Sequence, residues 1–304
     1  MKRILQILGI ILGIFLIVYL INLGKNLSIT IMIEEEYEKT HYINDLYNSK
    51  EINYRLALNN NERKLYDEII THINNFDTEF VVDLSGFRAK EIYGSFKKIS
   101  DVMQTIGMDH PELIQYGSSS FSKRKNDTSA TINITYTMTK EEYNVRVNEI
   151  KTIIEETKKN TEKMTEYEKV KYVYDYLGRK NSYGNPSDIN GQSAYSAFSD
   201  TLSPVCAGYA KASQILFQNI GINSLLIFGD AKYNLFIGDA HAWNNVQIDG
   251  AYYLYDVTYS SNGKDKSDEE FYIGFLTKDK SNYSPWYKKS SAFINGIKHQ
   301  NKNT

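Results

Sequence analysis

The stretch Ser203-Pro-Val-Cys-Ala-Gly-Tyr-Ala210 contains the single cysteine of this 304-residue chain. Apolar residues then recur at helical spacing as far as position 219, and Gly221 is a typical residue to end such a helix. The pattern predicts a helix over 207–219 with Cys206 in its first turn. Unpaired amides and the helix dipole favour an anion there. We therefore expect a lowered thiol pKa and amides that can donate to an oxyanion.

Two strands joined by a tight turn are predicted further along the chain. Residues 240–248 and 251–259 are rich in aromatic and β-branched side chains. Asp249-Gly250 between them is a preferred pair for a two-residue type I′ turn. Such a turn places Ile248 opposite Ala251 and so fixes the register of both strands.

This register brings a histidine and a carboxylate together. His241 faces Thr258 and Trp243 faces Asp256, so His241 and Asp256 are diagonal neighbours on one face of the ribbon. Backbones about 7–8 Å apart leave their side chains within hydrogen-bonding reach. A three-residue turn would put the two on opposite faces, so the prediction depends on the turn type.

A cysteine, a histidine and a carboxylate form the minimum set for a thiol nucleophile, its base and the group that orients the base. Each residue alone also has a simpler interpretation: Cys206 as a small buried hydrophobe, His241 as a satisfied core or edge histidine, Asp256 as a cap or turn residue. Their joint arrangement favours catalysis. His241 would take the thiol proton, Asp256 would fix the ring, and the thiolate would attack an amide carbonyl.

The motifs around these residues resemble the transglutaminase-like core over about residues 165–280. The resemblance implies an α+β, papain-like fold in which a helix bearing the cysteine packs on an antiparallel sheet bearing the histidine and the aspartate. It also implies Cys206 as nucleophile, His241 as base and acid, and Asp256 as orienter. Tyr259 departs from the pattern, since many members have tryptophan there. The matching segments are Ser193-Ala-Tyr-Ser-Ala-Phe198, Val205-Cys-Ala-Gly-Tyr-Ala210, His241-Ala-Trp-Asn244, Ile248-Asp-Gly-Ala-Tyr-Tyr253 and Asp256-Val-Thr258.

Three further residues are candidates for the cleft. Gln192 is expected either to donate to the oxyanion from its side chain or to be a surface loop amide. Tyr195 and Trp243 are expected either to wall the cleft or to belong to the core.

The chain begins with Lys2 and Arg3 followed by an apolar run from Ile4 to Gly24. A run of this length predicts a transmembrane anchor over 1–24, with its basic end in the cytoplasm. A cleaved signal peptide is the alternative, although no good cleavage site is present. The catalytic part would then lie outside the cytoplasm, anchored to the cell membrane by a single pass.

The remaining chain divides by pattern into four parts. Residues 25–60 are polar and predict a stalk, and residues 281–304 predict a frayed tail. Residues 61–160 predict an accessory α/β region, with helices near 62–76 and 92–107 and strands near 79–84 and 132–138. A capping box at Thr139 and Glu142 starts its last helix. Residues 161–280 form the predicted catalytic domain, and Thr165 with Glu168 is the capping box at its start.

Charge and residue spacing give expectations about the partners and cofactors of the protein. The net charge is −2, so nothing indicates a nucleic-acid partner, and no histidine or cysteine cluster has metal-ligand spacing, so no cofactor is expected. We expect a cysteine enzyme that acts on amide bonds of a protein or peptide substrate, with the cell envelope as one source, and we favour hydrolysis. The alternatives are a cross-linking transamidase and a non-catalytic envelope binding or assembly module on the same fold.

Overall fold

The computed structural model describes residues 53–87, 92–124, 126–232, 238–276 and 283–285. All of them belong to one compact unit that spans residues 44–304. The predicted anchor over 1–24, most of the predicted stalk and most of the predicted tail lie outside the described residues. Within the described residues, no helix combines the length and the apolar character that a membrane crossing requires.

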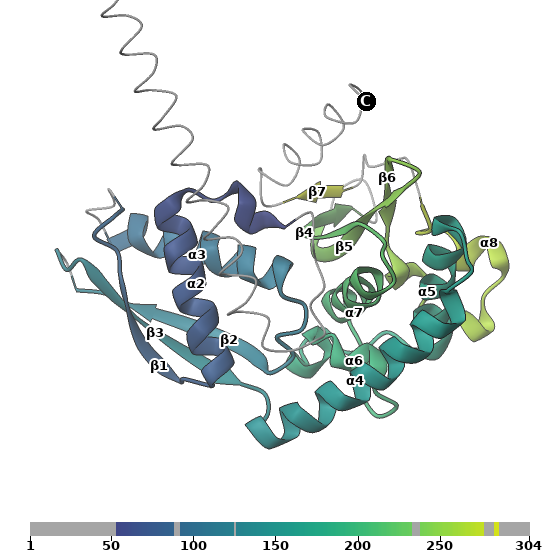
Figure 1. Cartoon of the computed structure of the whole chain (residues 1–304), viewed down its shortest axis with the longest axis horizontal. Helices are drawn as coiled ribbons and strands as arrows, with labels where there is room; N and C mark the ends of the chain where they lie inside the picture. Colours follow the sequence, from purple (N-terminus) through teal and green to yellow (C-terminus); the bar gives the residue numbers. More distant parts are fainter. Residues whose placement is uncertain (1–52, 88–91, 125, 233–237, 277–282, 286–304) are drawn as a thin grey trace, which may run out of the picture. The chain divides into compact units, whose positions relative to one another are not determined.

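The first half of the described chain forms a three-stranded antiparallel sheet with two helices (Figure 1). The strand order is β1-β3-β2, and α2 packs on α3 and on β1. Leu65, Ile69 and Ile73 are buried at the predicted helical spacing. The elements are the 3-10 turn η1 (Tyr54–Ala57), α2 (Asn60–Asn75), β1 (Glu79–Asp83), α3 (Ile92–Asp109), β2 (Tyr116–Ser122) and β3 (Ser129–Tyr136).

Two long helices connect this sheet to the second one. Both start at the capping boxes predicted from the sequence, with Thr139 and Thr165 as N-caps. Not every apolar residue on them is buried, since Val145 is 59% exposed and Tyr167 is 49% exposed. The helices are α4 (Lys140–Thr161) and α5 (Glu166–Lys180).

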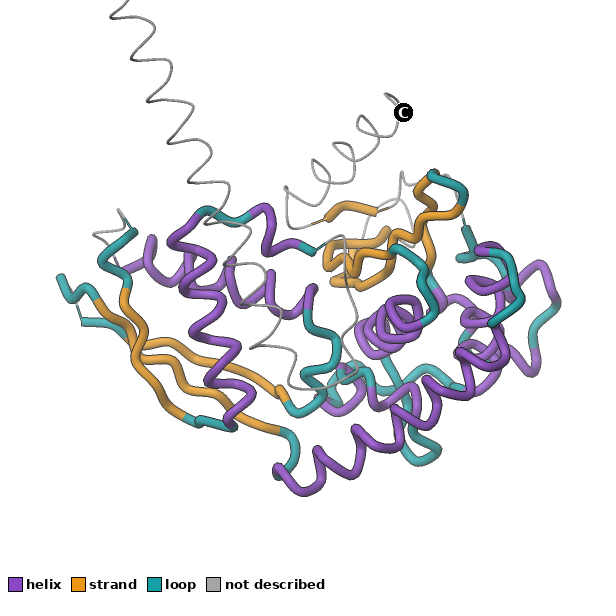
Figure 2. Tube along the Cα trace, viewed as in Figure 1, coloured by secondary structure: helices purple, strands orange, loops and turns teal. Residues whose placement is uncertain are grey.

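The second sheet is antiparallel, has the order β6-β5-β4-β7, and carries α7 on β4 and β5 (Figure 2). This arrangement confirms the predicted helix packed on an antiparallel sheet. The elements of this half are η2 (Ile189–Gln192), α6 (Tyr195–Phe198), α7 (Cys206–Asn219), β4 (Ser224–Lys232), β5 (Gly238–Ile248), β6 (Ala251–Tyr255), η3 (Val257–Ser260), η4 (Gly263–Asp265), α8 (Asp268–Phe271) and β7 (Tyr283–Pro285).

The predicted hairpin register is confirmed from Ile248 opposite Ala251 to Asn244 opposite Tyr255. Asp249 and Gly250 both have positive φ, as a type I′ turn requires. The predicted length of the second strand is wrong, because β6 ends at Tyr255 and not at residue 259. Asp256 caps the 3-10 turn η3 with its side chain and so turns the chain out of the sheet.

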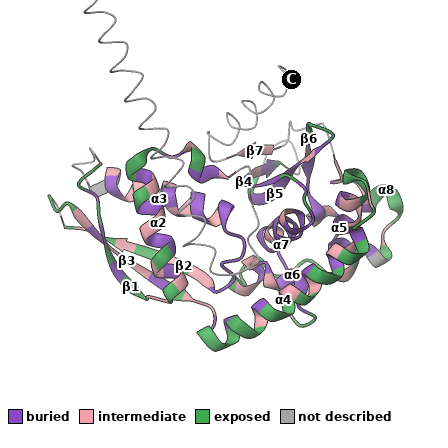
Figure 3. Ribbon diagram, viewed as in Figure 1, coloured by how far each residue is buried: buried purple, intermediate pink, exposed green. Residues whose placement is uncertain are grey.

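The largest core lies between α7, the second sheet and the helices α4 and α5 (Figure 3). A second cluster joins the two halves, because Tyr54 and Met108 pack on Leu225 and Trp243 of the second sheet. The Tyr54 hydroxyl also donates to the Leu226 carbonyl, 3.0 Å away. The 3-10 turn η1 and the helix α3 therefore attach the first half of the described chain directly to β4 and β5.

The predicted frayed tail is wrong for three residues. Tyr283–Pro285 form β7, which pairs antiparallel with β4. A polar segment with no apolar pattern gave no sign of this strand, because its partner supplies the hydrogen bonds that order it.

Candidate active site

Cys206 is the first residue of α7, as predicted, and lies at the wall of a cavity of about 910 Å³. Val205 before it is extended and provides no side-chain cap. The amides of the first turn therefore receive no cap from Val205, and the first-turn backbone is available to stabilise an anion at this end. The Val205 amide itself donates to the Gly191 carbonyl, 3.0 Å away, which holds the loop containing Gln192 next to Cys206.

His241 and Asp256 meet, as expected, although the predicted pairs His241–Thr258 and Trp243–Asp256 are not formed, because the strand pairing ends at Asn244 opposite Tyr255. Nε2 of His241 lies 2.6 Å from Oδ2 of Asp256, and both side chains are buried. The second carboxylate oxygen, Oδ1, accepts from the Thr258 amide at 3.1 Å. Asp256 is therefore both the cap that the simpler interpretation proposed and the hydrogen-bond partner of the imidazole.

The electrostatics of Cys206 and His241 are linked. Burial raises the pKa of the Cys206 thiol, but the hydrogen bond and charge of His241, the Ala242 amide and the Tyr183 hydroxyl outweigh burial, so that the pKa lies below its usual value of 9.0. Burial lowers the pKa of His241, but the Asp256 carboxylate and Cys206 raise it to about 10. Both directions favour a thiolate next to an imidazolium.

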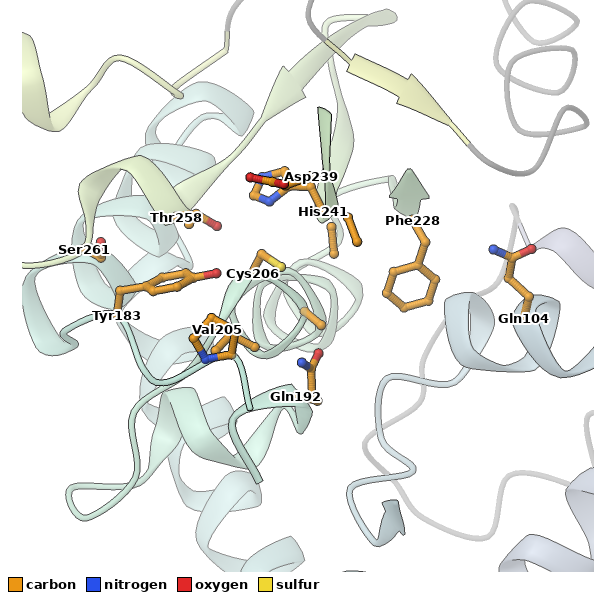
Figure 4. A pocket seen from close by; sticks show the side chains of 14 residues that line it. Gln104, Tyr183, Gln192, Val205, Cys206, Phe228, Asp239, His241, Thr258 and Ser261 are labelled. Atoms are coloured by element: carbon orange, nitrogen blue, oxygen red, sulfur yellow. The ribbon is translucent and has the colours of Figure 1, made fainter. Parts of the chain in front are cut away.

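The cavity beside Cys206 is lined mainly by apolar side chains, with a few polar groups facing it. Figure 4 shows Tyr183 and Gln192 near Cys206, and Phe228 and Gln104 further along the cavity. Gln104 belongs to α3, so the half of the chain that carries the first sheet contributes to this wall.

The three candidate cleft residues lie in different places relative to the cavity. Gln192 lines the cavity, as expected for an oxyanion donor. Trp243 does not line it and is 2% exposed, because its ring packs in the second cluster and lies roughly parallel to the His241 ring. Tyr195 also lies away from the cavity, since its hydroxyl bonds to Glu149 and its ring stacks under Arg146. Of the two alternatives expected for these residues, the structure favours the core for Trp243, and Tyr195 does not line this cavity.

Two tyrosines at the site were missed in the sequence. Tyr183 lines the cavity beside Cys206, and burial together with the Cys206 thiolate raises its pKa to about 12, so its hydroxyl remains a donor. Tyr283 donates from its hydroxyl to Oδ2 of Asp256 at 2.9 Å. The chain has 25 tyrosines, so neither position could be singled out by residue type alone.

No cluster of histidine, cysteine, aspartate and glutamate among the described residues could hold a metal ion.

Comparison with known proteins identifies the core. The family model of the Transglutaminase-like superfamily matches residues 152–257, which include Cys206, His241 and Asp256. No curated protein sequence matches the chain. The chain therefore contains a transglutaminase-like core.

Solved structures give weaker likenesses over longer stretches. A candidate cysteine protease from Cytophaga hutchinsonii is 14% identical with a TM-score of 0.31, over 48% of this chain and 63% of that one. The periplasmic domain of TgpA from Pseudomonas aeruginosa is 14% identical with a TM-score of 0.30, over 51% and 66%. A protein described as a TGase is 16% identical with a TM-score of 0.33, over 70% and 55%. The chain thus spans less than two thirds of the length of these proteins.

Proposed function

We propose that the protein is a cysteine enzyme that acts on amide bonds of a protein or peptide substrate through Cys206, His241 and Asp256. The observation that carries the proposal is the buried 2.6 Å hydrogen bond between His241 and Asp256, next to a cysteine at the first turn of a helix and at a cavity wall. A structural histidine needs a partner, but it has no need of a thiol with a lowered pKa on its other side.

The chemistry follows from the two ring nitrogens. Nε2 is held by Asp256, so Nδ1 is the nitrogen left to exchange a proton with the thiol. The thiolate attacks the amide carbonyl, and the imidazolium gives its proton to the leaving amine, which leaves a thioester on Cys206. First-turn amides of α7 and the Gln192 side chain, which lines the cavity, are the candidates to donate to the oxyanion.

Water then attacks the thioester, with His241 as base, and returns the free thiol and a carboxylic acid. An amine in place of water would give transamidation. We favour hydrolysis, because water is always present and no described residue at the cavity forms a recognisable amine-acceptor site.

We further propose the placement that the sequence indicates. Residues 1–24 would anchor the protein in the cell membrane, and the chain after them would form a stalk that is shorter than the predicted 25–60, because Tyr54 is already buried against the second sheet. Residues 61–160 would form an accessory region and residues 161–280 the catalytic domain outside the cytoplasm, where envelope peptides would be available as substrates.

The test incubates the full-length protein and the Cys206→Ala variant with a casein-like protein and a tagged primary amine. Mass spectrometry then separates two products. New termini that require Cys206 would support hydrolysis, and tagged glutamine that requires Cys206 would replace hydrolysis with transamidation. Neither product above the alanine control, together with a Cys206 thiol that reacts like free cysteine, would overturn the enzymatic proposal in favour of a binding module.

A further inference from the structure

A strand from beyond the matched family region reaches the candidate site. The family match ends at residue 257, whereas β7 begins at Tyr283. β7 adds to the free edge of β4, with Tyr283 opposite Ala231 and Pro285 opposite Gly229. β4 therefore lies between β7 and β5, the strand of His241.

The residues of β4 between β7 and β5 are small enough for a side chain of β7 to lie across β4 and reach β5. Gly229 lies opposite both His241 and Pro285, and Ala231 lies opposite both Asp239 and Tyr283. Paired residues and residues two apart share a face, so Tyr283 is on the face of His241. Two strand spacings of about 4.8 Å separate their backbones, and only a glycine and an alanine stand between them on that face. A tyrosine is long enough to cross this gap.

Tyr283 makes three contacts at the end of that crossing. Its hydroxyl donates to Oδ2 of Asp256 at 2.9 Å, the same oxygen that lies 2.6 Å from Nε2 of His241. Its ring lies edge-on to Trp243, with centroids 5.0 Å apart, and 6.2 Å from the His241 ring. Asp256 is therefore clamped, with the Thr258 amide on one oxygen and Tyr283 on the other.

A second tyrosine stands behind the first. The hydroxyl of Tyr259 hydrogen-bonds that of Tyr283. Burial and the Asp256 charge both raise the pKa of Tyr283, so its hydroxyl stays protonated at any pH at which the protein would work.

We infer that Tyr283 is a positioning residue for the Cys206–His241–Asp256 site, supplied by the segment that follows the transglutaminase-like core. The inference rests on the proposed function. Tyr283 does not touch the reacting atoms. It holds the carboxylate against the imidazole, which stabilises the imidazolium and, through it, the Cys206 thiolate.

The test measures alkylation of Cys206 by iodoacetamide as a function of pH, in the full-length protein. The chain has one cysteine, so labelling reports that thiol alone, and Cys206→Ala gives the background. The Tyr283→Phe variant should move the acid limb of the profile to higher pH by about one unit, which is about a tenfold loss of rate on that limb. The rate on the alkaline plateau should be unchanged, because the thiolate itself is the same.

Tyr136→Phe is the matched control. It removes a tyrosine hydroxyl that donates to the Asp77 carbonyl, also at 2.9 Å, in the part of the chain that carries the first sheet. A general loss of stability would lower the melting temperature in both variants, whereas only Tyr283→Phe should shift the limb.

Each outcome has one meaning. A wild-type thiol that titrates like free cysteine overturns the proposed function itself. If the acid limb of the wild-type profile lies at low pH and Tyr283→Phe does not move it, the inference about Tyr283 is overturned and the proposed function is not. If Tyr283→Phe does not fold, Tyr259→Phe keeps the Tyr283 ring and removes only the hydroxyl that contacts the Tyr283 hydroxyl, so a smaller shift in the same direction is expected, and no shift overturns the inference.

Discussion

His241 and Asp256 are joined by a 2.6 Å hydrogen bond, although the pairing of their strands stops one residue short of Asp256. β6 ends at Tyr255, and Asp256 then binds the Thr258 amide through its other oxygen. The carboxylate is therefore fixed by a turn at the strand end and by the imidazole at the same time. Because Asp256 has two partners, two substitutions can distinguish its role as a cap of η3 from its role as the partner of the His241 imidazole.

Asp256→Ala should reduce kcat/KM by about 10²–10⁴, because the imidazole loses the partner that orients it and stabilises its charge. Asp256→Asn should retain more activity, because its amide oxygen can still accept from Nε2 while the negative charge is lost. Steady-state kinetics on a peptide substrate, with circular dichroism to confirm folding, check both. Equal activity of the alanine variant and the wild type would show that Asp256 is only the cap of η3.

The pH dependence of activity follows from the two pKa shifts. The reactive form of Cys206 is the thiolate, which exists above a pKa that is lower than 9.0. The proton for the leaving amine is on His241 and is lost as the pH rises through about 10. Activity should therefore be high between these limits, fall in acid as the thiol is protonated, and fall again near pH 10.

A profile of kcat/KM from pH 4 to 11 checks this expectation, with near-ultraviolet circular dichroism at each pH to exclude unfolding. An acid limb centred near 9 would mean that His241 does not stabilise the thiolate. The pair of charges would then be absent from the free enzyme.

The part of the site that the sequence predicts is the part with local signals. Asp249-Gly250 fixes the hairpin register, and the positions of Cys206 and Gly221 relative to the apolar repeat fix the ends of α7. These signals need no knowledge of the rest of the molecule. They bring His241 and Asp256 together without reference to any other strand.

The part that the sequence does not predict depends on distant partners. No strand was predicted at β4, although β4 pairs with β5 over nine residues. β7 forms because it pairs with the other edge of β4. Tyr283 therefore reaches Asp256 only through a pairing that no local pattern encodes. β2 was not predicted for the same reason: most of its serines are exposed, and β3 supplies its hydrogen bonds.

Gly208 of α7 provides the last prediction, because it packs against the loop of Gln192 without room for a side chain. A Cβ at this position would lie 2.4 Å from the Gly191 carbonyl oxygen and 2.6 Å from the Ser196 hydroxyl. Gly208→Ala should therefore push the Gln192 loop away from Cys206 and lower kcat more than it raises KM, by about tenfold or more in kcat/KM, since small displacements of an oxyanion donor are expensive.

Gly107→Ala is the control, because a Cβ there meets only the Phe228 ring at 3.6 Å and alanine favours the helix of α3. Its melting temperature should equal or exceed that of the wild type, which separates the effect of the Gly208 clash from that of adding a methyl group to a helix. If Gly208→Ala keeps full kcat, the loop of Gln192 does not contribute to the oxyanion site, and the first-turn amides of α7 are left as its only donors among the groups considered for that role.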